Sequence, residues 1–327
     1  MATMGYTGIG ATQQGMDANR IGLCPVTAPS TGTIKSISLY TNNYTGANIK
    51  AFLVNASLAI VATSIPVFTY NSVNEWVEFF FATPPSVTSG TTYYLGFMGD
   101  SGTGYVYNAG TGVINKYDTS NNYASPTDPT DAGTLVDGTV SIYATYTDGE
   151  YLVDYYFGMT DSQANVQPEY SKRGQSFTVT SATTLKNIRL NIDKVNTPTG
   201  NAYVKLYAHT GTYGTSSVPT GSALATSDAL DTSTVTTARL WYTFNFSTPY
   251  VMTASTYYTF AIEHADCSNT NYIRISRDAS SPTHGGNFIY WDTAWAANNT
   301  QDMEFYVVGT PYVAPTGQYM STNRGYW

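Results

Sequence analysis

The sequence predicts an all-β protein of two tandem antiparallel β-sandwiches, because a strand-forming stretch occurs twice and because the composition favours strands and turns. The stretch WVEFFFATP, residues 76–84, returns as WYTFNFSTP, residues 241–249. Alternate side chains of a strand share one face, and proline ends the pairing because it has no N–H to donate. Four phenylalanines are therefore predicted to be buried: Phe79, Phe81, Phe244 and Phe246.

The opposite face of these stretches is mainly polar. Glu78 and Thr243 point there and are expected to tolerate alanine, whereas Phe80 interrupts the polar pattern. Trp76 and Trp241 open the two stretches. Because they recur at the same strand position, we interpret both as structural rather than ligand-binding.

Composition gives the second observation. Only 11% of the residues are charged, Tyr alone supplies 29, and Thr, Ser, Asn and Gly fill much of the rest. Aromatic and β-branched residues favour strands, and small polar residues favour turns. No window of about a dozen residues shows sustained helical spacing of apolar residues, so long amphipathic helices are not expected.

The matching segments occur in one order in both halves of the chain. Their offset grows only from about 150 to about 165 residues, which predicts an internal duplication with insertions in loops. The pairs are 34–39 with 185–190, 49–52 with 204–207, 61–64 with 224–227, 76–81 with 241–246, and 92–97 with 256–261.

After the last matched pair the sequences of the two halves diverge, as expected where a duplicated scaffold carries its functional residues. We predict a first sandwich over residues 1–150, a second over 151–313 and a C-terminal tail over 314–327. About eight short strands per half, with turn signals roughly every 8 to 12 residues, favour sandwiches of jelly-roll type. An immunoglobulin-like sandwich is the alternative, but the chain lacks its Cys…Trp…Cys framework.

Charge and hydropathy exclude two classes of partner. The formal net charge is −8 and no Lys/Arg-rich run is present, so nucleic acid is not an expected partner. No apolar run approaches the roughly 20 residues that cross a bilayer.

Residues 1–6 also lack the basic start and apolar segment of a secretory signal. Because the composition suits a protein that works outside cells, these features together favour a virion protein.

No catalytic or cofactor-binding motif can be assembled, so we predict that the protein is not an enzyme and needs no cofactor. A carboxylate pair for glycoside hydrolysis is the weaker alternative, and it would draw on Glu78, Asp100, Glu263 and Asp266.

No metal site is predicted either. Cys24 and Cys267 are interpreted as inert thiols, with a disulfide as the alternative, and together with three histidines they give no zinc spacing. Four aspartates could offer calcium oxygen ligands, but no EF-hand spacing supports such a site. These are Asp118, Asp128, Asp131 and Asp137.

Carbohydrate is the most specific ligand hypothesis. Exposed aromatic rings stack on sugar rings, and neighbouring Asp, Asn and Thr side chains bond hydroxyls. The alternative is that these aromatics only cap the ends of the sandwiches. The candidate residues are Trp291, Asp292 and Trp295 in the second half, and Tyr117, Asp118 and Tyr123 in the first.

Residues 32–39 (GTIKSISL), 61–64 (VATS), 76–85 (WVEFFFATPP) and 89–95 (SGTTYYL) carry a family resemblance. In this order they resemble β-sandwich repeats of phage, viral and secreted microbial surface proteins, some of which are compared with carbohydrate-binding modules. The resemblance recurs once per half and implies a non-enzymatic module on an outer surface. The shared positions are core and turn residues, so no functional residue is transferred.

Two functions follow as hypotheses. The first is a structural, decorating or attachment protein of a virion or other extracellular assembly, whose partners are copies of itself or other surface proteins. Its C-terminal tail would connect subunits through Tyr319, Tyr326 and Trp327. The second is a pair of carbohydrate-binding modules with glycans as partners.

Overall fold

The structure is a computed structural model that describes residues 2–42, 46–69, 74–119, 121–130, 133–158, 162–280 and 283–313. The predicted tail with Tyr319, Tyr326 and Trp327 lies outside these residues, as does Asp131. The described residues form strands and one 3-10 helix, η1 (Thr232–Thr234), which confirms the all-β prediction.

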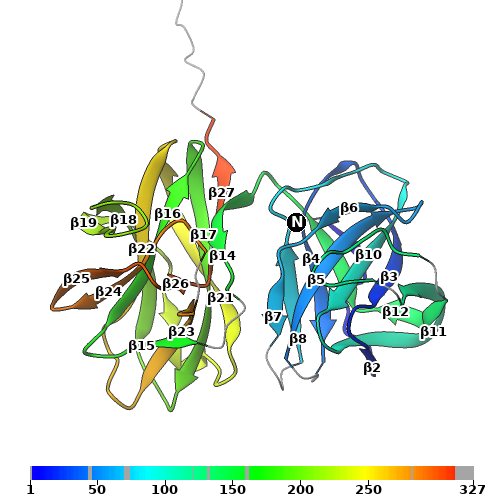
Figure 1. The fold of residues 1–327 in the computed structure, drawn as a ribbon, viewed down its shortest axis with the longest axis horizontal. Coiled ribbons are helices and arrows are strands. Elements are labelled where there is room, and N and C mark those ends of the chain that lie inside the picture. Colours follow the sequence, from blue (N-terminus) through cyan, green and yellow to red (C-terminus); the bar gives the residue numbers. More distant parts are fainter. Residues whose placement is uncertain are drawn as a thin grey trace, which may run out of the picture.

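The first half of the chain forms two packed antiparallel sheets (Figure 1). The first joining sheet has the order β1 (Thr3–Gly5), β13 (Ile142–Tyr146), β4 (Gly32–Thr41) and β8 (Glu75–Phe80), with β9 (Ser86–Val87) on β4. The first outer sheet has the order β12 (Thr134–Val140), β11 (Thr103–Asp118), β3 (Ile21–Thr27), β10 (Thr92–Gly99), β5 (Ala47–Asn55) and β6 (Ile60–Thr63), with β2 (Thr12–Met16) on β11 and β7 (Val67–Thr69) on β5.

The second half forms two further sheets. The second joining sheet has the order β14 (Tyr151–Tyr156), β27 (Phe305–Pro311), β17 (Thr183–Val195), β23 (Tyr272–Asp278) and β15 (Gln163–Val166), with β21 (Leu240–Met252) on β17 and β26 (Asp302–Met303) on β23. The second outer sheet has the order β19 (Val218–Thr226), β18 (Asn201–Thr210), β22 (Thr256–His264), β16 (Lys172–Val179), β24 (Phe288–Asp292) and β25 (Ala294–Asn298), with β20 (Leu230–Asp231) on β18.

Both sandwiches have the strand order of a jelly roll. The eight strands that carry it are β1, β3, β4, β5, β6, β8, β10 and β13 in the first half, and β14, β16, β17, β18, β19, β21, β22 and β27 in the second. In each half the first, eighth, third and sixth strands lie side by side in the joining sheet. The second, seventh, fourth and fifth lie side by side in the outer sheet. The jelly-roll prediction is thereby confirmed, and the immunoglobulin-like alternative is not adopted.

The repeated stretch has the same neighbour in both halves. Phe79 pairs with Ile37 across β8 and β4, and Phe244 pairs with Ile188 across β21 and β17. The four predicted core phenylalanines, Phe79, Phe81, Phe244 and Phe246, are buried, as expected from the strand alternation. A shared register is what a duplication would produce, but the duplication itself remains a prediction.

Each sandwich buries a core of its own. One core is built around Phe79 and Phe97, and the other around Phe244 and Phe260. The change from the first pair of sheets to the second falls between Tyr146 and Tyr151. The exact limits of the two predicted domains stay a prediction.

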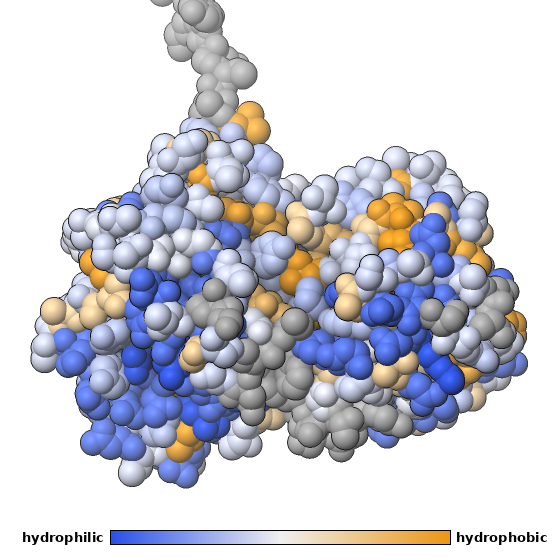
Figure 2. Space-filling view, in the orientation of Figure 1, coloured by the Kyte–Doolittle hydropathy of each residue, from blue (hydrophilic) through white to orange (hydrophobic). Residues whose placement is uncertain are grey.

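The two sandwiches meet through the solvent-side faces of their joining sheets (Figure 1), and the space-filling view shows apolar residues at this junction (Figure 2). Phe80 is 3% exposed and packs on Tyr306 of the second sandwich, with ring centroids 5.3 Å apart. Trp241 lies 4.5 Å from the same tyrosine ring, and Ile65 completes the cluster. The interruption of the polar face at Phe80 is therefore explained by contact between the sandwiches.

An ion pair crosses the same junction. Arg189 of β17 donates to the Glu78 carboxylate at 2.5 Å, and Ser36 donates to the other carboxylate oxygen at 2.6 Å. The Arg189 guanidinium also lies 5.0 Å from the Phe80 ring centroid. Glu78 therefore differs from Thr243, which is exposed, because the Glu78 carboxylate has partners that an alanine would lose.

The tryptophans that open the repeated stretches are both packed. Trp76 contacts the Tyr40 and Tyr143 rings edge-on, at 5.4 and 4.9 Å, whereas Trp241 belongs to the junction. Cys24 and Cys267 are both free, so the disulfide alternative is wrong. Within the described residues, no helix has the length and apolarity needed to cross a membrane.

We expect Phe79→Ala or Phe244→Ala to lower the free energy of unfolding by about 3 to 5 kcal/mol, because each truncation leaves a cavity in a closed core. Thr243→Ala should change it by less than about 0.5 kcal/mol. Urea denaturation followed by tryptophan fluorescence measures both. Similar losses in the phenylalanine and threonine variants would contradict the strand alternation.

We expect Glu78→Ala and Arg189→Ala each to lower stability by about 1 to 3 kcal/mol, less than for a fully buried pair because both side chains retain some exposure. The double variant should cost less than the sum of the two, because the second truncation removes a partner already lost. Additive losses in this thermodynamic cycle would argue against a direct interaction.

The same ion pair predicts a pH dependence. Burial raises the pKa of Glu78, but Arg189, the Ser36 hydroxyl and Lys35 lower it by more, so the net pKa lies below the usual range. A carboxyl with a lowered pKa contributes its full stabilisation above its unfolded pKa, and this is lost as the pH falls through its folded pKa. Thermal melting of Glu78→Gln should therefore depend less on pH in the acid range than melting of the unmodified chain.

Candidate functional site

The predicted tryptophan pair lies on a hairpin at the edge of the second outer sheet. Trp291 of β24 faces Trp295 of β25 across the strand pair, and the rings meet edge to face with centroids 5.3 Å apart. Thr293 closes the hairpin with a φ of 56°, and Asp292 beside it is exposed. Sequence analysis named Trp291, Asp292 and Trp295 together, and the structure keeps them on one hairpin.

The second outer sheet curls so that this hairpin approaches the far edge of the sheet. β25 and β19 lie at opposite ends of the strand order, yet the two strands contact each other. Both edges project away from the joining sheet (Figure 1). Trp295 thereby reaches Tyr207 of β18, with ring centroids 6.0 Å apart, and Tyr207 is buried on the solvent side of the sheet.

Charged groups surround these rings. The Lys172 amine lies 5.1 Å from the Trp291 ring centroid and 5.5 Å from that of Trp295. Glu263 accepts hydrogen bonds from the Tyr207 hydroxyl at 2.6 Å and from Lys205 at 2.7 Å, and it pairs with Lys172 at 3.3 Å. We call these six residues the aromatic face: Lys172, Lys205, Tyr207, Glu263, Trp291 and Trp295.

The electrostatics keep Glu263 ionised. Burial raises its pKa, but hydrogen bonds from Lys205 and Tyr207 and the charge of Lys172 lower it by more, so its pKa lies below the usual range. Burial and the bond to Glu263 raise the pKa of Tyr207, which therefore stays a neutral donor. The face thus presents aromatic rings beside fixed ammonium and carboxylate groups, which can stack on a ring and bond its hydroxyls.

The three candidates of the first sandwich have separate partners. Asp118 is 2% exposed and accepts hydrogen bonds from Asn121 and from the Thr130 backbone, both at 3.1 Å. Its carboxylate therefore orders the loop over residues 121–130. Tyr123 lies beneath the Lys50 amine, 4.3 Å from the ring centroid. Tyr117 lines a cavity of about 230 Å³ together with Arg20.

Three of the four carboxylates considered for glycoside hydrolysis also have separate surroundings. Glu78 lies at the junction of the sandwiches, Asp100 bonds Asn48, and Glu263 belongs to the aromatic face. Among the described residues, no group of three or more His, Cys, Asp or Glu side chains could hold a metal ion.

Sequence analysis missed the residues that strands far apart in the chain bring to the hairpin. Lys172, Lys205 and Tyr207 come from β16 and β18, and only the alternation of Tyr203, Lys205 and Tyr207 along β18 could have indicated a shared face. Glu263 was considered only as a catalytic carboxylate. The curl of the sheet, which brings Tyr207 to Trp295, leaves no local signal in the sequence.

Comparison with known proteins gives a weak likeness to viral proteins. The chain resembles the infectious bursal disease virus VP2 subviral particle at 12% identity, over 94% of this chain and 71% of the other, with a TM-score of 0.22. It resembles the structure of infectious bursal disease virus Gx strain at 12% identity, over 97% and 73%, with a TM-score of 0.15. No protein-family model matches the chain, and no curated protein matches it.

Proposed function

We propose that this protein is a non-enzymatic attachment protein of a virion or other extracellular assembly, and that it binds carbohydrate through the aromatic face. The observation that carries the proposal is the Trp291 and Trp295 hairpin, held over Tyr207 and beside Lys172 and Glu263. Its expected partners are glycans at the aromatic face, and other surface proteins or copies of itself at the remaining surface.

The two indole rings supply the stacking surface. They meet at an interplanar angle of 81°, so they present two surfaces nearly at right angles, with the Lys172 amine over both, against which a sugar ring would stack. Both rings are only half-buried, whereas Tyr207 beneath them is buried. The tyrosine therefore supports the hairpin, and the tryptophans are the contact residues.

The polar groups favour an uncharged sugar. Lys172 and Lys205 are balanced by Glu263 and by the exposed Asp292 at the tip of the hairpin. A face whose charges balance gains little from a sulfated or uronic acid polymer, since such a ligand is held through excess positive charge. We therefore expect neutral hexose polymers to bind best.

The lowered pKa of Glu263 supports binding rather than catalysis. A general acid for glycoside cleavage needs a raised pKa, and a second carboxyl group must lie across the sugar from it. Two lysines and a tyrosine instead hold Glu263 as a carboxylate, a state suited to accepting hydrogen bonds from sugar hydroxyls.

A glycan array with the purified full chain tests the proposal. We expect binding to neutral hexose polymers, and we expect Trp291→Ala or Trp295→Ala to weaken it roughly tenfold or more, since the stacking surface is lost. Tyr40→Ala is the matched control, because it removes a half-buried aromatic of the first sandwich that is not a candidate for sugar binding. Thermal melting checks that all variants fold. Absence of binding to any glycan, or unchanged binding in both tryptophan variants, would refute the proposal.

A second candidate function is that of a structural subunit. Residues 312 and 313 follow β27 and expose apolar side chains, with Tyr312 41% and Val313 80% accessible. Light scattering of the chain with and without residues 314–327 tests this candidate. A large oligomer that dissociates on truncation is the expected result, and a monomer in both cases would contradict it.

A further inference from the structure

A row of side chains crosses the second outer sheet at the level of the tryptophan hairpin. Tyr203 of β18 is paired with Glu263 of β22, and Glu263 is paired with Lys172 of β16. The Lys172 amine lies 5.1 Å from the centroid of the Trp291 ring on the next strand, β24. The row therefore begins and ends with an aromatic residue, Tyr203 and Trp291, and has a carboxylate and an amine between them.

Strand alternation places Tyr203 and Trp291 on the same side of the sheet. Tyr203 lies between two core residues of β18, and Trp291 follows a residue of β24 that packs against the same core. Both rings therefore point to the solvent side, where the ion pair of Glu263 and Lys172 lies. The residues that set this alternation are Ala202, Val204 and Tyr290.

The curl of the sheet leaves this row open and covers the rows next to it in the middle of the sheet. There the solvent-side residues are fully buried, because β25 and β19 approach each other over them. Tyr203, Glu263, Lys172 and Trp291 each keep part of their surface exposed. Open surface at this end of the sheet therefore runs across the strands. The covered residues are Ser176, Thr259, Ala261 and Ile289.

Tyr203 differs from Tyr207 in that its ring and hydroxyl are not engaged. Tyr207 donates to Glu263 and packs against Trp295. Among the described residues, the Tyr203 hydroxyl has no hydrogen-bond partner, and its ring contacts no other aromatic ring. A half-buried tyrosine in this state offers a ring face and a hydroxyl to a ligand.

The length of the row determines the size of a ligand that contacts both ends. Neighbouring strands lie about 4.8 Å apart, and three such steps separate β18 from β24, which gives about 14 Å in a flat sheet. The curl shortens this distance, but the side chains of Glu263 and Lys172 still separate the two rings. A single sugar stacked on Trp291 would leave Tyr203 without a contact, so contact with both rings requires linked sugars.

The charged groups between the rings suit the hydroxyls of such a chain. Glu263 accepts from Lys205 at 2.7 Å and pairs with Lys172 at 3.3 Å, so all three side chains are held in place. The carboxylate can accept from sugar hydroxyls, and the amines can donate to them.

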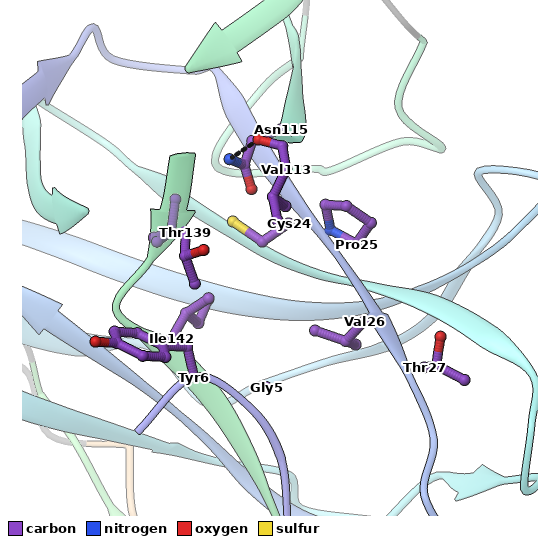
Figure 3. A pocket seen from close by; sticks show the side chains of 11 residues that line it. Gly5, Tyr6, Cys24, Pro25, Val26, Thr27, Val113, Asn115, Thr139 and Ile142 are labelled. Carbon is purple, nitrogen blue, oxygen red and sulfur yellow. Dashed lines mark hydrogen bonds between the residues drawn. The ribbon is translucent and has the colours of Figure 1, made fainter. Parts of the chain in front are cut away.

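The cavity of the first sandwich is not a second row of this kind (Figure 3). It has a volume of about 330 Å³, and among the described residues that line it Tyr6 is the one aromatic and none is charged. Figure 3 shows Tyr6 beside Ile142, with Cys24 and Asn115 at the other end. We therefore expect one oligosaccharide for each protein chain, at the second sandwich.

We propose that Tyr203 is a third stacking residue of the carbohydrate site, and that this site binds a linear, neutral oligosaccharide laid across the strands from Trp291 to Tyr203. Trp291 and Trp295 would hold one end of the oligosaccharide, so the assignment of Tyr203 rests on the proposed function. A disaccharide would contact the hairpin end alone, whereas a longer chain would also contact Tyr203.

The length of the oligosaccharide tests this proposal on the unmodified full chain. The probes are cellotetraose, maltotetraose, laminaritetraose and mannotetraose, each compared with its disaccharide by calorimetric titration. In a series that binds, we expect the tetrasaccharide to bind roughly tenfold more tightly than the disaccharide. Equal affinity for the two lengths would overturn the proposal. No binding of any of these sugars would overturn it together with the proposed function.

Variants separate the contribution of Tyr203 from that of the hairpin. Tyr203→Ala should remove the preference for the tetrasaccharide and leave disaccharide binding unchanged, whereas Trp291→Ala should weaken binding of both. Tyr203→Phe should keep the preference, because the ring remains. Tyr272→Ala is the matched control, because Tyr272 is half-buried and belongs to the joining sheet.

Unchanged tetrasaccharide affinity in Tyr203→Ala, together with weakened binding in Trp291→Ala, would overturn the role of Tyr203 and leave the proposed function standing. Thermal melting checks that each variant folds. The comparison of the two lengths on the unmodified chain remains decisive if Tyr203→Ala fails to fold.

Discussion

The contact between the two joining sheets is the constraint on which the rest of the structure depends. A sheet in a sandwich buries one face in its own core, so its second face is free for water or for another domain. In this protein the second faces of both joining sheets meet, with Phe80, Trp241 and Tyr306 between them and the Arg189 to Glu78 pair beside them. The outer sheets are thereby left facing away from each other, and each can present a surface of its own.

A structural feature can be predicted from this sequence only where it depends on residues that are close together in the chain. The period of two along residues 76–81 is local, and it correctly identified Phe79 and Phe81 as core residues. It also showed that Glu78 and Phe80 share the other face. It could not show that this face meets a second sandwich, because that depends on residues more than a hundred positions away, such as Arg189 and Tyr306.

Some contacts of the candidate site likewise depend on residues close together in the chain, and others depend on distant strands. Trp291 and Trp295 lie on adjacent strands joined by a tight turn, so their proximity follows from nearby residues. Lys172 joins them because β16 pairs with β24, whereas Tyr207 joins them only because the second outer sheet curls until its two edges meet. In the first half, Tyr117-Asp118-Thr119 has the same aromatic-Asp-Thr order as Trp291-Asp292-Thr293. There the aspartate is buried in loop contacts, so a shared motif did not give a shared environment.

The bulge of β11 and the tryptophan hairpin lie in the same part of the jelly-roll scaffold. The connection between the seventh and eighth strands holds β11 and β12 in the first half, and β23 to β26 in the second. In each half an inserted strand pairs with the second strand of the jelly roll, β11 with β3 and β24 with β16, and so extends the outer sheet at one edge. β11 and β12 in the first half, and β24 and β25 in the second, form one edge of the outer sheet. The strands at this edge form a bulge between Ala109 and Ile114 in one sandwich and a tryptophan hairpin in the other. The core positions repeat between the halves because packing constrains them, and the chemistry differs because this edge is free to vary.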